Sequence, residues 1–161
     1  MVDFPKILEV LEDARVNYVL IGGGAMIAHG SAYVTRDVDI CYDRTRENLK
    51  RLAEGLRPFH PRLRGAPPEL PFLWDEETLR RGMNFTLATD LGDIDLLGEV
   101  SGLGSYTDAL ASSQPLQAYG RQCQVLTLEA LIRTKKATGR GKDLAGVVEL
   151  EALLNLRKEG P

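Results

Sequence analysis

The chain has 161 residues, of which 27% are charged and 43% hydrophobic, and its formal net charge at pH 7 is -3. This length suffices for one domain that buries about two thirds of its unfolded surface without a disulfide framework. The acidic balance excludes a general attraction to nucleic acid, so such a partner would require a local basic patch.

Neither the cysteines nor the first residues indicate an exported or membrane protein. Cys41 and Cys123 lie in apolar stretches without metal-site spacing, which predicts reduced thiols in the core of an intracellular protein. The opening stretch MVDFPKILEVLEDARV mixes acidic with apolar residues, unlike a signal peptide or a membrane span. We therefore expect a cytoplasmic protein without a membrane partner.

The first third of the chain alternates helices and strands. Apolar spacing predicts a helix over residues 4–15, and the apolar run 19–21 predicts a buried strand. A short helix that begins on the three glycines is expected at 25–29, and alternation predicts a strand in DVDICYD, residues 37–43. A further amphipathic helix is expected over 46–56.

The middle of the chain predicts a loop and a hairpin. Residues 57–71 contain five prolines and a glycine, which favour a loop without regular structure. The runs 83–88 and 93–97 are typical of strands, and Gly92 supplies the turn freedom for them to pair as a hairpin.

The remainder of the chain is predicted to be mainly helical. A short helix near Tyr106 and a brief strand at 122–126 precede helices at 128–138, capped by Thr127, and 142–156. The whole pattern predicts an α/β (α+β) fold, with a central mixed β-sheet flanked by helices and a helical C-terminal tail.

The glycine run Gly22, Gly23 and Gly24 has two interpretations. A glycine-rich turn into a helix lets backbone N–H groups approach a phosphate, but it is also an ordinary tight turn after a buried strand. The dinucleotide fingerprint fails because Ile27 stands where it requires glycine, and no lysine follows at the spacing of a phosphate loop.

Asp37 and Asp39 are two residues apart on the expected strand, so their side chains share one face about 6.6 Å apart. Two such carboxylates repel each other unless a cation lies between them, which favours a divalent metal site over a solvated strand face. A calcium loop is excluded, because Tyr42 and Asn48 stand where it requires glycine and glutamate. A phosphatase nucleophile is disfavoured because Cys41 follows the second acid.

The joint pattern resembles one superfamily. IGGGAMIAHG followed by TRDVDI, with a later acid in DIDLLGEV, is similar to the signature of the polymerase-beta-like nucleotidyltransferases. The tail LIRTKKATGRGKDLAGVVELEAL resembles small bacterial members grouped with abortive-infection (AbiEii-type) toxins and the minimal nucleotidyltransferases. The resemblance implies a nucleotidyltransferase fold in one domain, residues 1–161, with its catalytic core over about 17–100 and a helical tail over about 127–157.

The resemblance also implies a metal-dependent site. Asp37, Asp39 and Asp95 are expected to hold two Mg²⁺ ions, or Mn²⁺, that bind the triphosphate of a nucleotide. Asp95 would also orient or deprotonate the acceptor hydroxyl. Asp93 is expected to belong to the turn, although whether it shares the role of Asp95 stays open.

The nucleotide is expected to lie against the glycines. Gly22 begins this turn, and the backbone amides of Gly23 and Gly24 would receive the β and γ phosphates. Basic side chains are candidate counter-charges, although those in the tail also suit a helix C-terminus. These candidates are Arg36, Lys136, Arg140 and Lys142.

Other side chains are assigned structural roles. His29 and His60 have no metal-site spacing, so we expect them to be structural or exposed. Trp74 is expected to pack in the core or against a partner rather than to stack a base.

These features favour a transferase that moves a nucleoside monophosphate from a nucleoside triphosphate to a hydroxyl on an RNA end, a protein or a small molecule, releasing pyrophosphate. An alternative is a catalytically idle relative that binds nucleotide or a partner protein as a regulatory or toxin–antitoxin component. A sugar-nucleotide transferase is a third reading, disfavoured because such enzymes usually need a longer chain.

Overall fold

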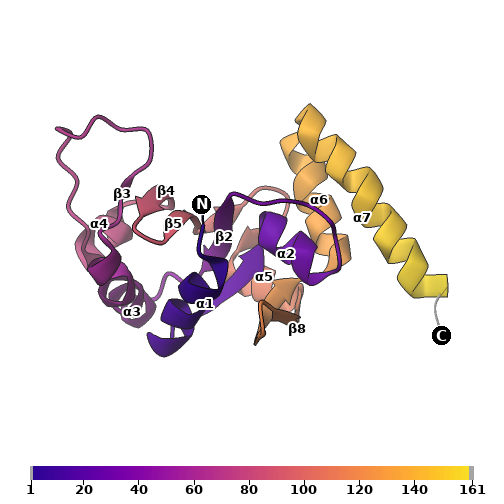
Figure 1. Ribbon diagram of the computed structural model, residues 1–161, viewed down its shortest axis with the longest axis horizontal. Coiled ribbons are helices and arrows are strands. Elements are labelled where there is room, and N and C mark those ends of the chain that lie inside the picture. Colours follow the sequence, from indigo (N-terminus) through magenta and orange to yellow (C-terminus); the bar gives the residue numbers. More distant parts are fainter. Residues whose placement is uncertain (1, 160–161) are drawn as a thin grey trace.

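The computed structural model describes residues 2–159, apart from the side chains of residues 142 and 143, and is built on a mixed seven-stranded sheet (Figure 1). The strand order is β3-β4-β5-β2-β1-β9-β8, and β6 pairs separately with β7. The strands are β1 (Tyr18–Ile21), β2 (Asp37–Tyr42), β3 (Arg62–Leu63), β4 (Asn84–Thr89), β5 (Gly92–Leu97), β6 (Glu99–Val100), β7 (Gly104–Ser105), β8 (Ser113–Ala118) and β9 (Arg121–Leu126).

The helices flank this sheet, and the last two form a tail. They are α1 (Phe4–Asp13), α2 (Gly22–Ala28), α3 (Arg46–Leu56), α4 (Glu76–Arg81), α5 (Tyr106–Ala111), α6 (Leu128–Thr138) and α7 (Gly141–Glu159). The cap expected at Thr127 is confirmed, because its hydroxyl accepts a hydrogen bond of 3.2 Å from the Ala130 amide. Figure 1 shows α7 running beside α6 and away from the sheet.

The centre of the sheet agrees with the predicted pattern. β2 is antiparallel to β1 and parallel to β5. β4 and β5 form the expected hairpin, and Gly92 at its turn has a φ of +116°. Val38 and Ile40 are fully buried on one side of β2, whereas Asp37 and Asp39 alternate with them and are half-buried on the other side.

The local structure differs from the expectations in three segments. The short helix expected over 25–29 forms as α2 but starts at Gly22, so all three glycines lie inside it. The proline-rich segment contains a 3₁₀ turn, Arg57–Phe59, and β3, which pairs with Leu87 and Ala88. The polar strand β8 was not predicted; it forms the sheet edge beside β9, where its Pro115 is tolerated.

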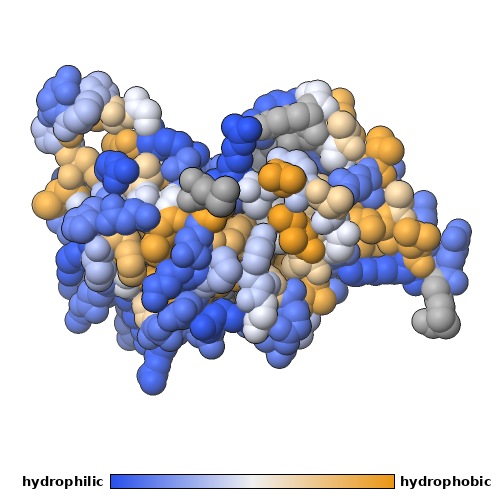
Figure 2. Space-filling model, viewed as in Figure 1, coloured by the Kyte–Doolittle hydropathy of each residue, from blue (hydrophilic) through white to orange (hydrophobic). Residues whose placement is uncertain are grey.

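The tail presents apolar surface to solvent. Figure 2 shows hydrophobic side chains along α7, and exposed apolar residues of this helix include Val148 and Leu156. No helix within residues 2–159 is both long and apolar enough to cross a membrane.

Trp74 packs in the core, which was one of its two expected roles. Its side chain is buried, and its indole Nε1 donates a hydrogen bond of 2.8 Å to the carbonyl of Ala53 on α3. The ring therefore ties the segment before α4 to α3.

Asn48 holds the start of α3 against the ends of two strands. Its side chain is fully buried; Oδ1 accepts from the Asn17 amide at 2.7 Å, and Nδ2 donates to the carbonyls of Asn17 at 3.1 Å and Asp43 at 2.7 Å. The side chain thus satisfies three backbone groups that precede β1 and follow β2.

We expect Asn48→Ala to lower the free energy of unfolding by about 2 to 3 kcal/mol, because three buried backbone groups each lose a hydrogen bond and only the Asn17 carbonyl keeps another, from the Asp43 amide. Urea denaturation would measure the loss, with Asn155→Ala on the exposed face of α7 as the matched control. Equal midpoints for the two variants would contradict this role.

Candidate functional site

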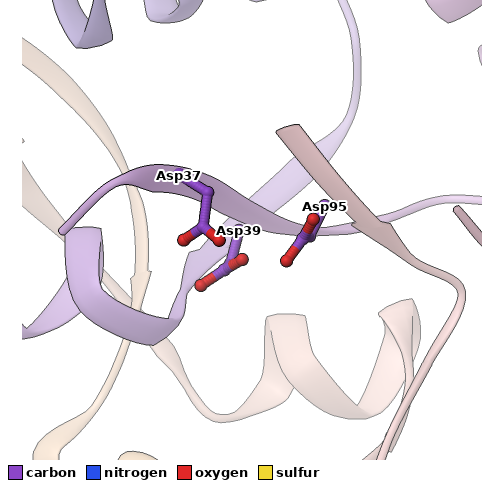
Figure 3. A group of neighbouring side chains, drawn as sticks. All are labelled: Asp37, Asp39 and Asp95. Carbon is purple, nitrogen blue, oxygen red and sulfur yellow. The ribbon is translucent and has the colours of Figure 1, made fainter. Parts of the chain in front are cut away.

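Three aspartates converge where β2 and β5 run side by side (Figure 3). Asp37 and Asp39 project from β2, and Asp95 lies directly opposite Asp39 in the parallel register. Each offers a carboxylate oxygen, and these oxygens lie within 4.8 Å of one another. Carboxylate oxygens are the ligands that Mg²⁺ and Mn²⁺ prefer, so this donor set fits a divalent cation.

Asp93 is part of the same strand face, not of the turn as expected. It lies in β5 opposite Asp37, with a side chain that is 41% exposed. It does not belong to the close group formed by the other three carboxylates among the described residues. It lies instead at the margin of the cluster.

The close packing of the carboxylates disfavours their charged forms. Burial, the charge of Asp37 and the contact with Asp95 together raise the pKa of Asp39 to about 8. Burial and the neighbouring Asp95 also raise the pKa of Asp37. A bound divalent cation would reverse this balance and stabilise the charged carboxylates.

These shifts predict that the metal-free protein loses stability as the pH rises from 6.5 to 8. The folded state retains a proton on Asp39 up to its pKa of about 8, whereas the unfolded chain releases it near pH 4, so rising pH favours unfolding. The loss should be about 1 to 2 kcal/mol. The lowered pKa of His29, caused mainly by burial, acts below this window and in the opposite direction.

Chemical denaturation in the presence of a chelator would measure this slope, with Asp39→Asn as the comparison. The variant should show a smaller slope, and so should the unaltered protein in Mg²⁺. A stability that is constant or rising between pH 6.5 and 8 in the chelated, unaltered protein would contradict the assigned electrostatics.

Arg64 is a member of the site that the sequence did not reveal. It follows β3, and its guanidinium contacts Asp95 directly, while Nη1 lies 3.6 Å from Asp37 and Nε 3.4 Å from Asp93. In the sequence it is one basic residue in a proline-rich loop. Only the pairing of β3 with β4 brings it to the carboxylates.

The turn before α2 requires glycine because β2 and the segment before it lie very close. Gly22 has a φ of +61°, and a Cβ added there would lie 2.2 Å from Oδ2 of Asp39. At Gly23 a Cβ would lie 2.7 Å from Oγ1 of Thr35. Gly24 faces the other way, since its Cβ would lie 2.4 Å from Cζ of Phe4.

A cavity of about 730 Å³ opens beside this turn. The carboxylates and the first two glycines line one side of it, and α6 and α7 line the other. This volume lies within the range of about 300 to 1,000 Å³ that is typical of small-ligand sites. The cavity therefore places a ligand-sized space against the candidate metal ligands.

Only some of the basic residues predicted to bind phosphate line the cavity. Arg36 and Arg140 line the cavity, as does Lys135, which was not among the candidates. Lys136 does not line it and pairs with Glu151 at 3.3 Å. The side chain of Lys142 lies outside the described residues.

The two histidines lie apart from the carboxylates. His29 is buried, and its Nε2 lies 2.7 Å from the carbonyl of Leu126, which suits a structural role. His60 is exposed, and its Nδ1 lies 2.5 Å from Oδ2 of Asp90.

Comparison with known proteins identifies the fold. The chain matches no protein-family model and no curated protein sequence. It is similar to the lincomycin-bound crystal structure of the lincosamide antibiotic adenylyltransferase LnuA, with a TM-score of 0.62 and 15% identity over 95% of this chain and 98% of the other. The chain has a nucleotidyltransferase fold.

Two further structures with this fold are similar to the chain. A nucleotidyltransferase-like antigenic protein from Paracoccidioides brasiliensis matches with a TM-score of 0.54 and 14% identity, over 92% of this chain and 73% of that one. A putative nucleotidyltransferase from Thermotoga maritima matches with a TM-score of 0.50 and 18% identity, over 99% and 97%. At these identities the likeness establishes the fold alone.

Proposed function

We propose that the protein is a metal-dependent nucleotidyltransferase of the polymerase-beta-like superfamily, which moves a nucleoside monophosphate from a nucleoside triphosphate to a hydroxyl acceptor and releases pyrophosphate. The observation that carries this proposal is the group of three carboxylates, with oxygens within 4.8 Å of one another, beside a glycine turn in a nucleotidyltransferase fold. The assignment to small members related to abortive-infection toxins stays a prediction.

In this proposal the three aspartates hold the metal ions. Asp37 and Asp39 are the ligands that face the triphosphate, and Asp95 completes the set from β5. Divalent ions bound there would neutralise charge on the phosphates and on the leaving pyrophosphate. Asp95 would also accept or orient the proton of the attacking hydroxyl.

The phosphates are held by the turn and the cavity wall. The first N–H groups of a helix have no partners within it, so those at the start of α2 are donors for phosphate oxygens. Arg36, Lys135 and Arg140 line the same cavity and supply positive charge. Lys135 replaces Lys136 in this role, because Lys136 faces Glu151.

A small molecule is the acceptor class to test first. The cavity is bounded by α6 and α7, and its volume of about 730 Å³ suits a nucleotide with a small partner better than a nucleic-acid duplex. The net charge of -3 also gives no general attraction to nucleic acid. The similar LnuA structure contains lincomycin, which is an example of such a ligand in this fold.

Label transfer would test this function. The protein is incubated with each α-labelled nucleoside triphosphate and a cell extract, in Mg²⁺ or in chelator, and the products are divided into acid-precipitable and small-molecule fractions. We expect Mg²⁺-dependent transfer of label, mainly into the small-molecule fraction. Absence of transfer with all four nucleotides, together with absence of any nucleotide binding by calorimetry, would exclude the proposal.

The idle relative remains a second candidate because of one observation: Arg64 satisfies Asp37 and Asp95 much as a structural counter-ion would. This candidate predicts nucleotide or partner binding without any label transfer. Calorimetric binding that persists while transfer is absent would favour it, and a partner recovered with the protein would then connect it to the regulatory or toxin–antitoxin role.

A further inference from the structure

Arg64 reaches across three strands to the candidate metal ligands. Its backbone amide donates to the carbonyl of Thr86 at 3.0 Å, which fixes the residue beside β4. Its Nη2 donates to the carbonyl of Leu87 at 3.2 Å and to Oδ1 of Asp95. The side chain is 30% exposed, so it is held by contacts rather than left in solvent.

The same guanidinium contacts carboxylates from both β2 and β5. Nη1 lies 3.6 Å from Oδ2 of Asp37, and Nε lies 3.4 Å from Oδ2 of Asp93. Asp37 and Asp95 belong to the close group of Figure 3, whereas Asp93 lies at its margin. One cation therefore neutralises part of a cluster that carries four carboxyl groups.

A guanidinium and a divalent ion use the same acceptor lone pairs of a carboxylate. An ion bound by Asp37 and Asp95 would also lie close to the positive charge of Arg64, and like charges at such distances repel each other strongly in a partly buried site. The observed position of Arg64 and a metal bound to both carboxylates are therefore alternatives.

We propose that Arg64 is the resident cation of the carboxylate cluster in the metal-free protein, and that it withdraws toward Asp93 when a divalent ion binds, so that it lowers the metal affinity of the site. This inference rests on the proposed function. Asp93 is suited to hold the withdrawn side chain, because it already contacts Nε and lies outside the close group. The arrangement gives Asp93 a role distinct from that of Asp95.

Metal affinity in variants tests this competition. We expect Arg64→Gln to bind Mn²⁺ about tenfold more tightly than the unaltered chain, because the competing charge is gone while a polar side chain remains. Free Mn²⁺ is measured by electron paramagnetic resonance, with and without a nucleoside triphosphate. Arg62→Gln is the matched control, since Arg62 lies in β3 two residues before Arg64 and its side chain donates only to the carbonyl of His60 among the described residues; its affinity should be unchanged.

A second measurement follows the Arg64 side chain in the unaltered protein. Magnetic resonance of the arginine Nε–Hε groups in the unaltered chain, with the Arg64 signal assigned from its loss in Arg64→Lys, should show a saturable shift of that signal as Mg²⁺ is added. A signal that does not move at Mg²⁺ concentrations that raise the melting temperature would overturn the inference.

The outcomes separate the two proposals. Tighter Mn²⁺ binding by Arg64→Gln supports the competition even if no acceptor is found. If the unaltered chain binds Mn²⁺ measurably, and at least as tightly as Arg64→Gln does, the inference is overturned and the nucleotidyltransferase function stands. Absence of Mn²⁺ binding by both proteins, with every nucleotide, overturns both.

Discussion

Asp39→Asn should reduce nucleotidyl transfer by about a thousandfold, equivalent to about 4 kcal/mol of transition-state stabilisation. Asp39 faces Asp95 across the β2–β5 register and adjoins Gly22, so this candidate metal ligand also borders the glycine turn proposed to bind phosphate. Asparagine keeps the shape of the side chain but loses the anionic ligand that a divalent ion requires.

The same substitution should make the metal-free protein more stable. The pKa of Asp39 is raised to about 8, chiefly by burial and by Asp37, so the folded state pays for keeping this acid among its neighbours. The amide of asparagine carries no charge and can still donate to Asp95. We expect the free energy of unfolding at pH 8 to rise by about 2 kcal/mol.

Single-turnover label transfer and urea denaturation would measure the two effects of Asp39→Asn. Asp90→Asn is the matched control, because Asp90 is an exposed carboxylate that pairs with His60 away from the cluster; it should retain transfer. Transfer by Asp39→Asn within tenfold of the unaltered chain would remove Asp39 from the catalytic set.

Gly22→Ala should have the second largest effect, because it combines backbone strain with displacement of Asp39, a candidate metal ligand. A residue with a side chain is disfavoured at φ +61° by about 1 kcal/mol or more, and the new Cβ would lie 2.2 Å from Oδ2 of Asp39. The carboxylate or the turn must move. We expect a loss of about 2 kcal/mol of stability and about a hundredfold loss of transfer.

Gly120→Ala separates these two causes. Gly120 has a φ of +81° in the β8–β9 turn, but a Cβ there would meet nothing within 4 Å. It should therefore show the conformational cost alone, with a lower melting temperature and normal transfer. Equal transfer by Gly22→Ala and Gly120→Ala would show that the closeness of Gly22 to Asp39 has no functional importance.

The sequence predicted the features of the site that arise from local periodicity. The period of two along a strand placed Asp37 and Asp39 on one face, and the hairpin at Gly92 placed Asp95 in a strand that pairs with residues 84–89. The register that sets Asp95 opposite Asp39 depends on a pairing between distant segments. Local patterns carry no information about that pairing.

Arg64 could not be predicted for the same reason. Its approach to the carboxylates requires that a two-residue strand, Arg62–Leu63, adds to β4, within a segment whose prolines favour a loop. The edge strand β8 was missed because its outward positions are polar and it includes a proline. Both depend on long-range pairing.

Lys135, in contrast, could have been selected from the sequence. It follows Leu131 by four residues and therefore shares its face of α6, and both line the cavity. Lys136 is about 100° further round the helix and faces Glu151. Helix phase, rather than the count of basic residues, distinguishes the two lysines.

The parallel alignment of β2 with β5 makes the proposed transfer activity a sensitive reporter of correct strand alignment. A slip of one residue would turn Asp93 and Asp95 to the opposite side of the sheet while most helices stayed intact. A refolded preparation with full helical circular dichroism and depressed specific turnover would thus contain misaligned molecules.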